Sequence, residues 1–168
     1  MRARRCPAPV ADVPYRWQSA PVDSALLDVR RVKYALFVDL GRAPSLAEVS
    51  RHALVAEQEV ASAWRELHDQ HALVLKPNAL EIRMANPFSG VPTPYRVHAR
   101  GRWWYANCGW DAFGICAALG TDGDIEWPCA DCGEPLSVEV IDTRPSRTDF
   151  VFHCLVPARE WWADIGFT

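Results

Sequence analysis

The chain has 168 residues, of which 49% are apolar, so it can bury the core of one medium-sized domain or of two small ones that share a core. Its formal net charge of −3 argues against non-specific nucleic-acid binding as the main activity, because that activity usually needs a basic face. No apolar run approaches the roughly 18 residues that span a bilayer, which argues against a membrane-embedded chain.

The N-terminal segment, residues 1–23, is rich in proline and alanine and is predicted to be a flexible arm. Its positive charges are not followed by an apolar core, so it lacks the pattern of a secretory signal, and we expect a cytoplasmic protein. Thiols stay reduced in the cytoplasm. The six cysteines are therefore expected to be metal ligands, reactive thiols or small buried residues rather than disulfide partners.

Three helices are predicted next along the chain. Apolar residues recur at helical spacing over residues 24–40, and residues 57–71 have a similar apolar face. Between them, Ser45 and Glu48 form the capping-box pattern that starts a short helix. Two β-prone runs then flank residues 76–78 and predict a hairpin.

Three helices followed by a hairpin make residues 24–85 a winged-helix-like module. Such a module either binds DNA through its third helix or packs against a neighbouring part of the protein. The third helix carries four acidic residues and a single arginine, Arg65, which is a poor match to a phosphate backbone. DNA is therefore not expected as a partner.

The second half of the chain begins with residues 86–97, which contain three prolines and a glycine and predict an extended linker. Residues 98–168 are expected to form a second domain, in which a strand or hairpin precedes a helix over residues 106–120. Two further strands are predicted over residues 136–140 and 150–156, and the last segment begins like an amphipathic helix. The predicted fold class is α+β, with the three-helix module packed on a small mixed sheet with helices.

A cysteine and an aspartate stand three residues apart in the most aromatic stretch of the chain. On a helix, Cys108 and Asp111 would share a face, with their Cβ atoms about 5–6 Å apart. Aromatic neighbours exclude water, which raises the pKa of a carboxyl group and keeps a proton available. The pair suits a soft electrophile that sulfur binds while the carboxyl group protonates the leaving part. The alternative is a buried structural cysteine with an aspartate that the helix dipole favours.

A second cysteine motif, Cys129-Ala130-Asp131-Cys132-Gly133, has the spacing of a zinc knuckle or a redox dithiol. A structural zinc site normally needs four ligands, and the other candidates are isolated in the sequence: Cys6, Cys116, His153 and Cys154. Zinc at Cys129 and Cys132 is one hypothesis, and a tight turn without a metal is the other.

The segments ANCGWDAFGICAALG, CADCGEPLSVEV and VPAREWWADIGFT, in this order, resemble the organomercurial (alkylmercury) lyase family. The winged-helix-like module and the segment IRMANPFSGVPTPYRV are similar to divergent lyase-like proteins of that family, so the resemblance spans residues 25–168. It implies that Cys108 and Asp111 are catalytic and that Cys129 is structural. The implied reaction is protonolysis of a carbon–mercury bond, in which thiolates take the mercury and the aspartic acid protonates the departing carbanion.

The resemblance also implies a set of ligands and partners. The organic group of the substrate would lie against Trp104, Trp110, Phe113 and Cys116. Mercury would bind Cys108, with Cys129 and Cys132 as further candidate metal ligands. The products would be a hydrocarbon and Hg(II), which a thiol acceptor removes, and no cofactor would be required.

A second active-site cysteine is part of the implied family pattern. In this protein it either lies beyond Thr168 or is replaced by Cys116, Cys132 or Cys154, and Cys116 is the first candidate because it follows Asp111 by little more than one helical turn. Two other functions stay open. One is a lyase fold that acts on a different substrate, and the other is a cysteine-based metal sensor whose winged helix reads DNA.

Overall fold

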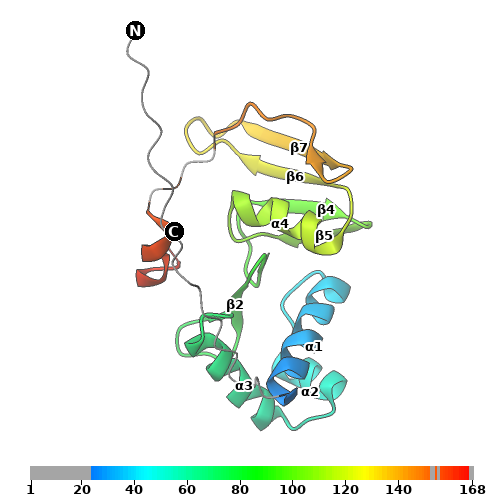
Figure 1. The fold of residues 1–168 in the computed structure, drawn as a ribbon, viewed down its shortest axis with the longest axis vertical. Helices are drawn as coiled ribbons and strands as arrows, with labels where there is room; N and C mark the ends of the chain where they lie inside the picture. The colour runs from blue at the N-terminus through cyan, green and yellow to red at the C-terminus, as the bar shows by residue number, and fades with distance from the viewer. Residues whose placement is uncertain (1–23, 152–153, 155, 167–168) are drawn as a thin grey trace, which may run out of the picture.

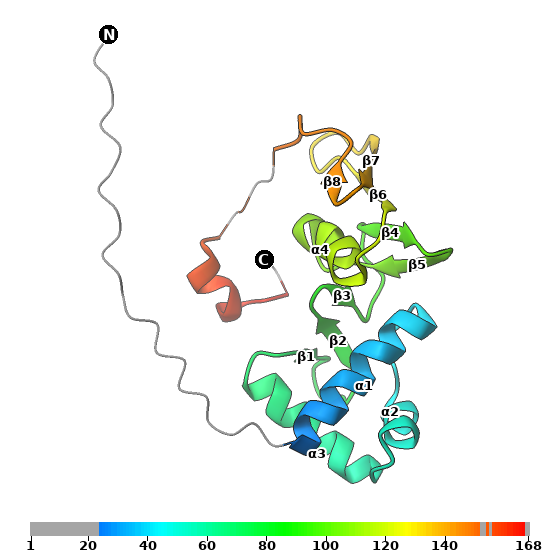
Figure 2. The same cartoon turned by 45° about the vertical axis from the view of Figure 1, so that its right-hand side comes forward.

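The computed structural model describes residues 24–151, 154 and 156–166, so the predicted arm over residues 1–23 and the candidate ligands Cys6 and His153 lie outside the described residues. Helices occupy one end of the molecule, a five-stranded sheet occupies the other, and a small three-stranded sheet lies between them (Figures 1 and 2). Among the described residues, no helix has both the length and the apolar character needed to cross a bilayer.

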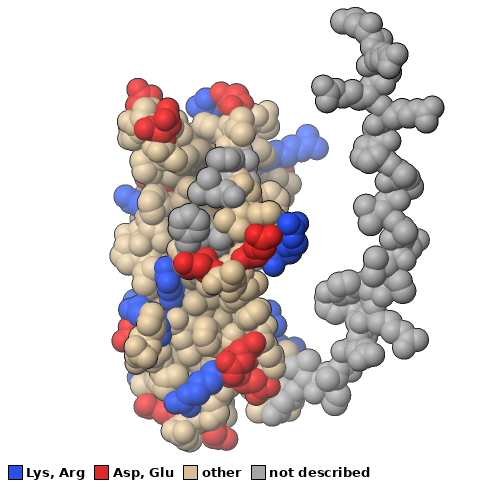
Figure 3. All heavy atoms as spheres, turned by 90° about the vertical axis from the view of Figure 1, so that its left-hand side faces the viewer, with Lys and Arg blue, Asp and Glu red and all other residues tan. Residues whose placement is uncertain are grey.

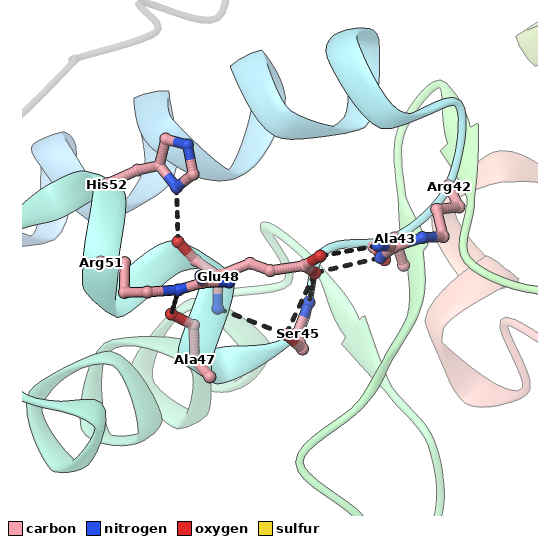
Figure 4. A network of polar contacts seen from close by, with 7 residues as sticks. All are labelled: Arg42, Ala43, Ser45, Ala47, Glu48, Arg51 and His52. Carbon is pink, nitrogen blue, oxygen red and sulfur yellow. Dashed lines mark hydrogen bonds and ion pairs between the residues drawn. The ribbon is translucent and has the colours of Figure 1, made fainter.

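The helical end contains α1 (Ser24–Leu40), α2 (Leu46–Ala53) and α3 (Glu57–Asp69), as the apolar periodicity predicts. The predicted capping box at the start of α2 is confirmed (Figure 4). The Ser45 N–H donates to the Glu48 carboxylate over 2.8 Å, and the Glu48 N–H donates to the Ser45 hydroxyl over 3.3 Å. Arg42 holds the same carboxylate with bonds of 2.6 and 3.0 Å, which lowers the pKa of Glu48 to about 2. The helix start therefore keeps its charged cap well into acidic solution.

The hairpin predicted after α3 is present as β1 (Val74–Leu75) and β2 (Ile82–Ala85), which pair antiparallel. A third strand, β3 (Phe88–Ser89), pairs with β2 inside the stretch that we expected to be a linker, and both of its residues are buried. The three helices and hairpin agree with a winged-helix-like arrangement, and the assignment as a winged helix stays a prediction.

The larger sheet contains β4 (Arg96–Ala99), β5 (Arg102–Tyr105), β6 (Gly123–Pro128), β7 (Pro135–Ile141) and β8 (Arg144–Pro145), in the order β5-β4-β6-β7-β8. Helix α4 (Gly109–Leu119) connects β5 to β6 and buries Ala112, Ile115, Cys116 and Leu119. The α+β class is confirmed, but the expected mixed sheet is wrong, since all four pairings are antiparallel. Tight hairpins join three of the strand pairs, and α4 returns the chain beside β4 in the opposite direction.

The strand predicted over residues 150–156 is not found in its described part, because Phe150, Val151, Cys154 and Val156 belong to no strand. Phe150 instead packs edge-on against Trp127 of β6, with ring centroids 5.0 Å apart. The chain then forms a short 3₁₀ helix, η1 (Ala158–Ala163), where an amphipathic helix was expected. In both Figure 1 and Figure 2, η1 stands at mid-height on one side of the molecule.

The two ends of the molecule share one apolar core, which an aromatic contact between α1, β3 and β5 connects. Phe37 stacks on Phe88 with ring centroids 5.5 Å apart, and Phe88 lies 6.4 Å from Trp104. The buried Trp104 indole N–H donates to the Phe37 carbonyl over 2.9 Å. Because buried aromatic rings provide much of the packing energy of a small core, these contacts hold the helices against the sheet.

Charges on the surface are mixed in sign. On the face shown in Figure 3, Lys and Arg side chains alternate with Asp and Glu over the described residues. The acidic residues of α3, namely Glu57, Glu59, Glu66 and Asp69, are all exposed. This distribution is unlike the basic stripe that binds a phosphate backbone.

Candidate active site

Cys108 and Asp111 lie together at the start of α4, directly after β5. Two backbone contacts fix the segment before them. Ala106 forms an isolated antiparallel β-bridge with Phe88, and the Ala106 N–H donates to the Tyr95 carbonyl over 3.0 Å. Cys108 is the N-cap residue in extended conformation, and Gly109 begins the helix. Asp111 is the acidic residue of the first turn, where the helix dipole favours a carboxylate. The predicted helix therefore forms, with Cys108 as its N-cap residue and Asp111 in its first turn.

The Cys108 thiol is half-buried, and its pKa is raised above the ordinary value. Burial is the largest cause, because an apolar environment disfavours the thiolate. The backbone N–H groups of Asp111 and Trp110 oppose this effect, although the sulfur makes no capping hydrogen bond, while the negative charges of Asp111 and Cys154 reinforce it. Cys108 thus holds its proton more firmly than an exposed thiol does.

The Asp111 carboxyl group also has a raised pKa, again because of burial. The Asn107 side-chain amide donates to Asp111 Oδ2 over 2.9 Å, which partly offsets the rise. The same amide donates to Asn86 Oδ1 over 3.0 Å and so ties the turn to the segment between β2 and β3. A carboxyl group with a raised pKa, held in one orientation, is suited to proton donation.

Asn107 and Asn86 were not selected from the sequence. The spacing of four residues between Asn107 and Asp111 could have indicated the first contact, because such pairs meet on a helix. Asn86 stands 21 positions before Asn107, and no local pattern indicates their contact. The buried Asn107 Oδ1 atom has no hydrogen-bond partner among the described residues.

The four predicted pocket residues point in different directions. Trp104 is buried in the core, and Cys116 is buried on the sheet side of α4, where its sulfur faces Gly123 of β6. Trp110 is 68% exposed and Phe113 is 37% exposed. Four cavities with volumes of about 200 to 880 Å³ lie elsewhere, and neither Cys108 nor Asp111 lines any of them. The structure brings the Cys–Asp pair together without assembling these four residues around it.

Cys129 and Cys132 lie in the turn between β6 and β7. The Cys129 N–H donates to the Glu134 carbonyl over 2.7 Å, and Gly133, with φ of 75°, donates back to the Cys129 carbonyl over 2.9 Å. The backbone N–H groups of Cys132 and Asp131 lower the pKa of Cys129. In the part of the chain that the structure describes, no group of three or more His, Cys, Asp or Glu side chains could hold a metal. The described residues therefore do not complete the hypothesised zinc site.

The fold of this chain is similar to that of a protein of known structure. The crystal structure of the mercury-bound form of MerB2 superposes with a TM-score of 0.59 and 23% identity, over 76% of this chain and 61% of that chain. The chain thus has the fold of that protein and spans about three fifths of its length. No curated protein matches the sequence.

A similarity to a known family is found in the second half of the chain. The model of the MerB family, alkylmercury lyase, matches residues 88–168, which include β3, the five-stranded sheet, α4 and η1. These residues of the chain are similar to the alkylmercury lyase family. The predicted resemblance is confirmed.

Proposed function

We propose that the protein cleaves carbon–mercury bonds, with Cys108 as the mercury ligand and Asp111 as the proton donor. One observation carries this proposal: a thiol and a carboxyl group adjoin at the first turn of α4, and burial raises the pKa of both. Both groups hold their protons more firmly than they would in water. One group can therefore exchange its proton for mercury while the other supplies a proton to carbon.

The proposed reaction has two steps. In the first, the Cys108 sulfur replaces the thiolate or other anion on the organomercurial, and the thiol proton is released to the neighbouring carboxylate or to solvent. In the second, the Asp111 carboxyl proton is transferred to the carbon as the carbon–mercury bond breaks, which leaves the hydrocarbon, the Asp111 carboxylate and Hg(II) on sulfur. Asn107 orients the carboxyl group through its bond to Oδ2.

A second sulfur ligand stabilises Hg(II) after the bond breaks, and Cys154 is the best candidate among the described residues. Its thiol is exposed, and its charge reaches Cys108, where it raises the pKa of the first thiol. Cys116 was the first candidate from the sequence, but it is buried against β6 and lies about 12 Å along the helix axis from Cys108. We therefore assign the second role to Cys154, and a small thiol would then carry Hg(II) away.

Turnover of phenylmercury acetate with excess 2-mercaptoethanol tests the proposal, with benzene release measured by gas chromatography. We expect Cys108→Ser to reduce benzene release to the background rate, because a hydroxyl group binds mercury far more weakly than sulfur does. Cys129→Ser is the matched control and should keep the wild-type rate, since Cys129 lies in the β6–β7 turn. Wild-type turnover that persists in Cys108→Ser would overturn the assignment.

A further inference from the structure

A polar pocket of about 200 Å³ lies between α1, the β1–β2 sheet and the chain from η1 onward. Arg30 and Tyr34 line it from α1, His71 lines it from the end of α3, and Trp162 and Ile165 close its outer side. The His71 and Trp162 rings are stacked, with centroids 3.9 Å apart and planes 7° from parallel. This stacking fixes the C-terminal wall of the pocket against the helical end of the molecule.

The charge around this pocket is positive and lacks a described counter-ion. Arg30 carries a positive charge, and no Asp or Glu is among the lining residues. No carboxylate forms an ion pair with Arg30 in the described part of the chain. A guanidinium group at the edge of a half-enclosed pocket is a suitable partner for a carboxylate, which it can hold with two parallel hydrogen bonds.

Lys33, which precedes the pocket residue Tyr34 on α1, is a second basic group that the charge of Arg30 affects. Its side chain is fully buried, and its Nζ atom has no hydrogen-bond partner among the described residues. The ammonium group lies 4.0 Å from the centre of the Tyr34 ring. Burial and then the charge of Arg30 lower the pKa of Lys33 to about 7. A bound anion beside Arg30 would offset this repulsion.

The remaining walls determine the kind of anion. Most of the surface of the pocket is polar, and Leu73, Val74, Met84, Ile165 and the indole of Trp162 provide the smaller apolar part. A cationic edge beside an aromatic ring suits a small aromatic acid better than a bare inorganic anion.

The pocket is connected to the candidate active site through two shared residues. The Tyr34 hydroxyl donates to the Asn86 carbonyl over 3.0 Å, and the Asn86 side chain accepts from Asn107, which in turn holds Asp111. The charge of Asp111 also contributes to the raised pKa of Tyr34, after the larger effect of burial. The pocket is therefore linked to the proton donor by a chain of three hydrogen bonds.

We propose that this pocket binds the carboxylate end of a small organic acid, with Arg30 as the anion partner and with Trp162 and Ile165 beside the organic body. The relation to catalysis rests on the proposed function: the carboxylate is carried either by the organic group of the mercurial or by the thiol that removes mercury. The binding itself does not depend on that function.

Binding of benzoate, measured by calorimetry with benzamide as the uncharged analogue, tests the pocket directly. We expect benzoate to bind the wild type, and Arg30→Gln to weaken it by about tenfold or more. Arg31→Gln is the matched control, because the adjacent Arg31 pairs with Asp28 and is absent from the pocket lining. It should bind benzoate as the wild type does. Equal affinity for benzoate and benzamide, or full affinity in Arg30→Gln, would overturn the proposal.

Turnover then distinguishes the two sources of the carboxylate. If the substrate carries it, the ratio of kcat/KM for 4-carboxyphenylmercury to that for phenylmercury falls about tenfold in Arg30→Gln. If the acceptor carries it, the same variant loses the preference for mercaptoacetate over 2-mercaptoethanol. Benzoate binding that depends on Arg30, without turnover of any mercurial, would refute the proposed function and leave the pocket supported. An active enzyme with no change in either ratio would refute the link to catalysis.

Discussion

Cys108 and Cys129 begin similar short motifs, C-x-x-D and C-x-x-C, yet their surroundings shift their pKa values in opposite directions. Burial at the start of α4 raises the pKa of Cys108, even though two backbone N–H groups favour its thiolate. In the β6–β7 turn, comparable N–H groups act with little burial, and the pKa of Cys129 is lowered. Desolvation, rather than motif spacing or a helix N-terminus, decides which sulfur keeps its proton.

The largest expected effect on the reaction rate comes from replacing Asp111, the aspartate three residues after Cys108. Asp111→Asn removes the proton donor, and we expect the rate of benzene release from phenylmercury to fall by about 10²–10⁴-fold. Asp131→Asn, in the other motif, should change the rate by less than about threefold, because that residue is exposed in a turn. Single-turnover kinetics with phenylmercury already bound to the enzyme isolate the protonation step, and a rate for Asp111→Asn near that of Asp131→Asn would contradict the proposed role.

The conclusion that burial controls the pKa of a side chain can be tested at a third group, Lys33. Lys33→Met removes a fully buried cation without a hydrogen-bond partner and should increase the free energy of unfolding at pH 7 by about 1–4 kcal/mol. The folded-state pKa of about 7 lies below the ordinary 10.5. The unfolded chain therefore binds more protons between these values, and wild-type stability should rise as the pH increases from 7 to 10.5.

Urea denaturation at pH 7 and pH 10 measures both effects of Lys33. The pH-dependent gain should be smaller in Lys33→Met than in the wild type. Lys76→Met is a suitable control, because Lys76 forms a partly exposed ion pair with Glu81 over 2.6 Å. That substitution should change stability by less than about 1 kcal/mol. A destabilised Lys33→Met protein would show that the buried ammonium group is compensated.

The reactivity of the two cysteines gives a smaller but more direct comparison. At pH 8, iodoacetamide should alkylate Cys129 about tenfold faster than Cys108, because a larger fraction of Cys129 is thiolate and its turn is more open. The rate at Cys108 should keep rising above pH 9, while the rate at Cys129 should level off at lower pH. Mass spectrometry of the peptides follows each site, and unfolding in urea should make the two rates similar. Faster alkylation of Cys108 would reverse the comparison.

The smallest expected effect compares two helix caps. Ser45→Ala removes the capping bond of α2 and should lower stability by about 1 kcal/mol. Cys108→Ser places a preferred capping residue at the start of α4, where the sulfur makes no such bond, and should leave stability unchanged or raise it by about 0.5 kcal/mol. Thermal unfolding measures both. A large loss of stability in Cys108→Ser would indicate that Cys108 has a structural role.

Local patterns in the sequence predicted the helices, the capping box at Ser45, the hairpin before Ala85 and the turn at Gly133. Each depends on interactions between residues that are a few positions apart, so a single stretch of sequence contains the necessary signal. The same short range applies to Cys108 and Asp111, although Cys108 is the N-cap residue of α4 and does not lie on the helix face.

Tertiary structure alone decided the features that join distant segments. The contact from Asn86 to Asn107, the position of Cys154 near Cys108 and the direction of Cys116 toward β6 all arise from packing of elements that the sequence does not order in space. Phe150 leaves the predicted strand because Trp127, 23 positions earlier, offers it an apolar surface. Burial, which shifts the pKa values of Cys108 and Lys33, is likewise a property of the assembled core, since a residue is removed from water only by neighbours that the fold brings to it.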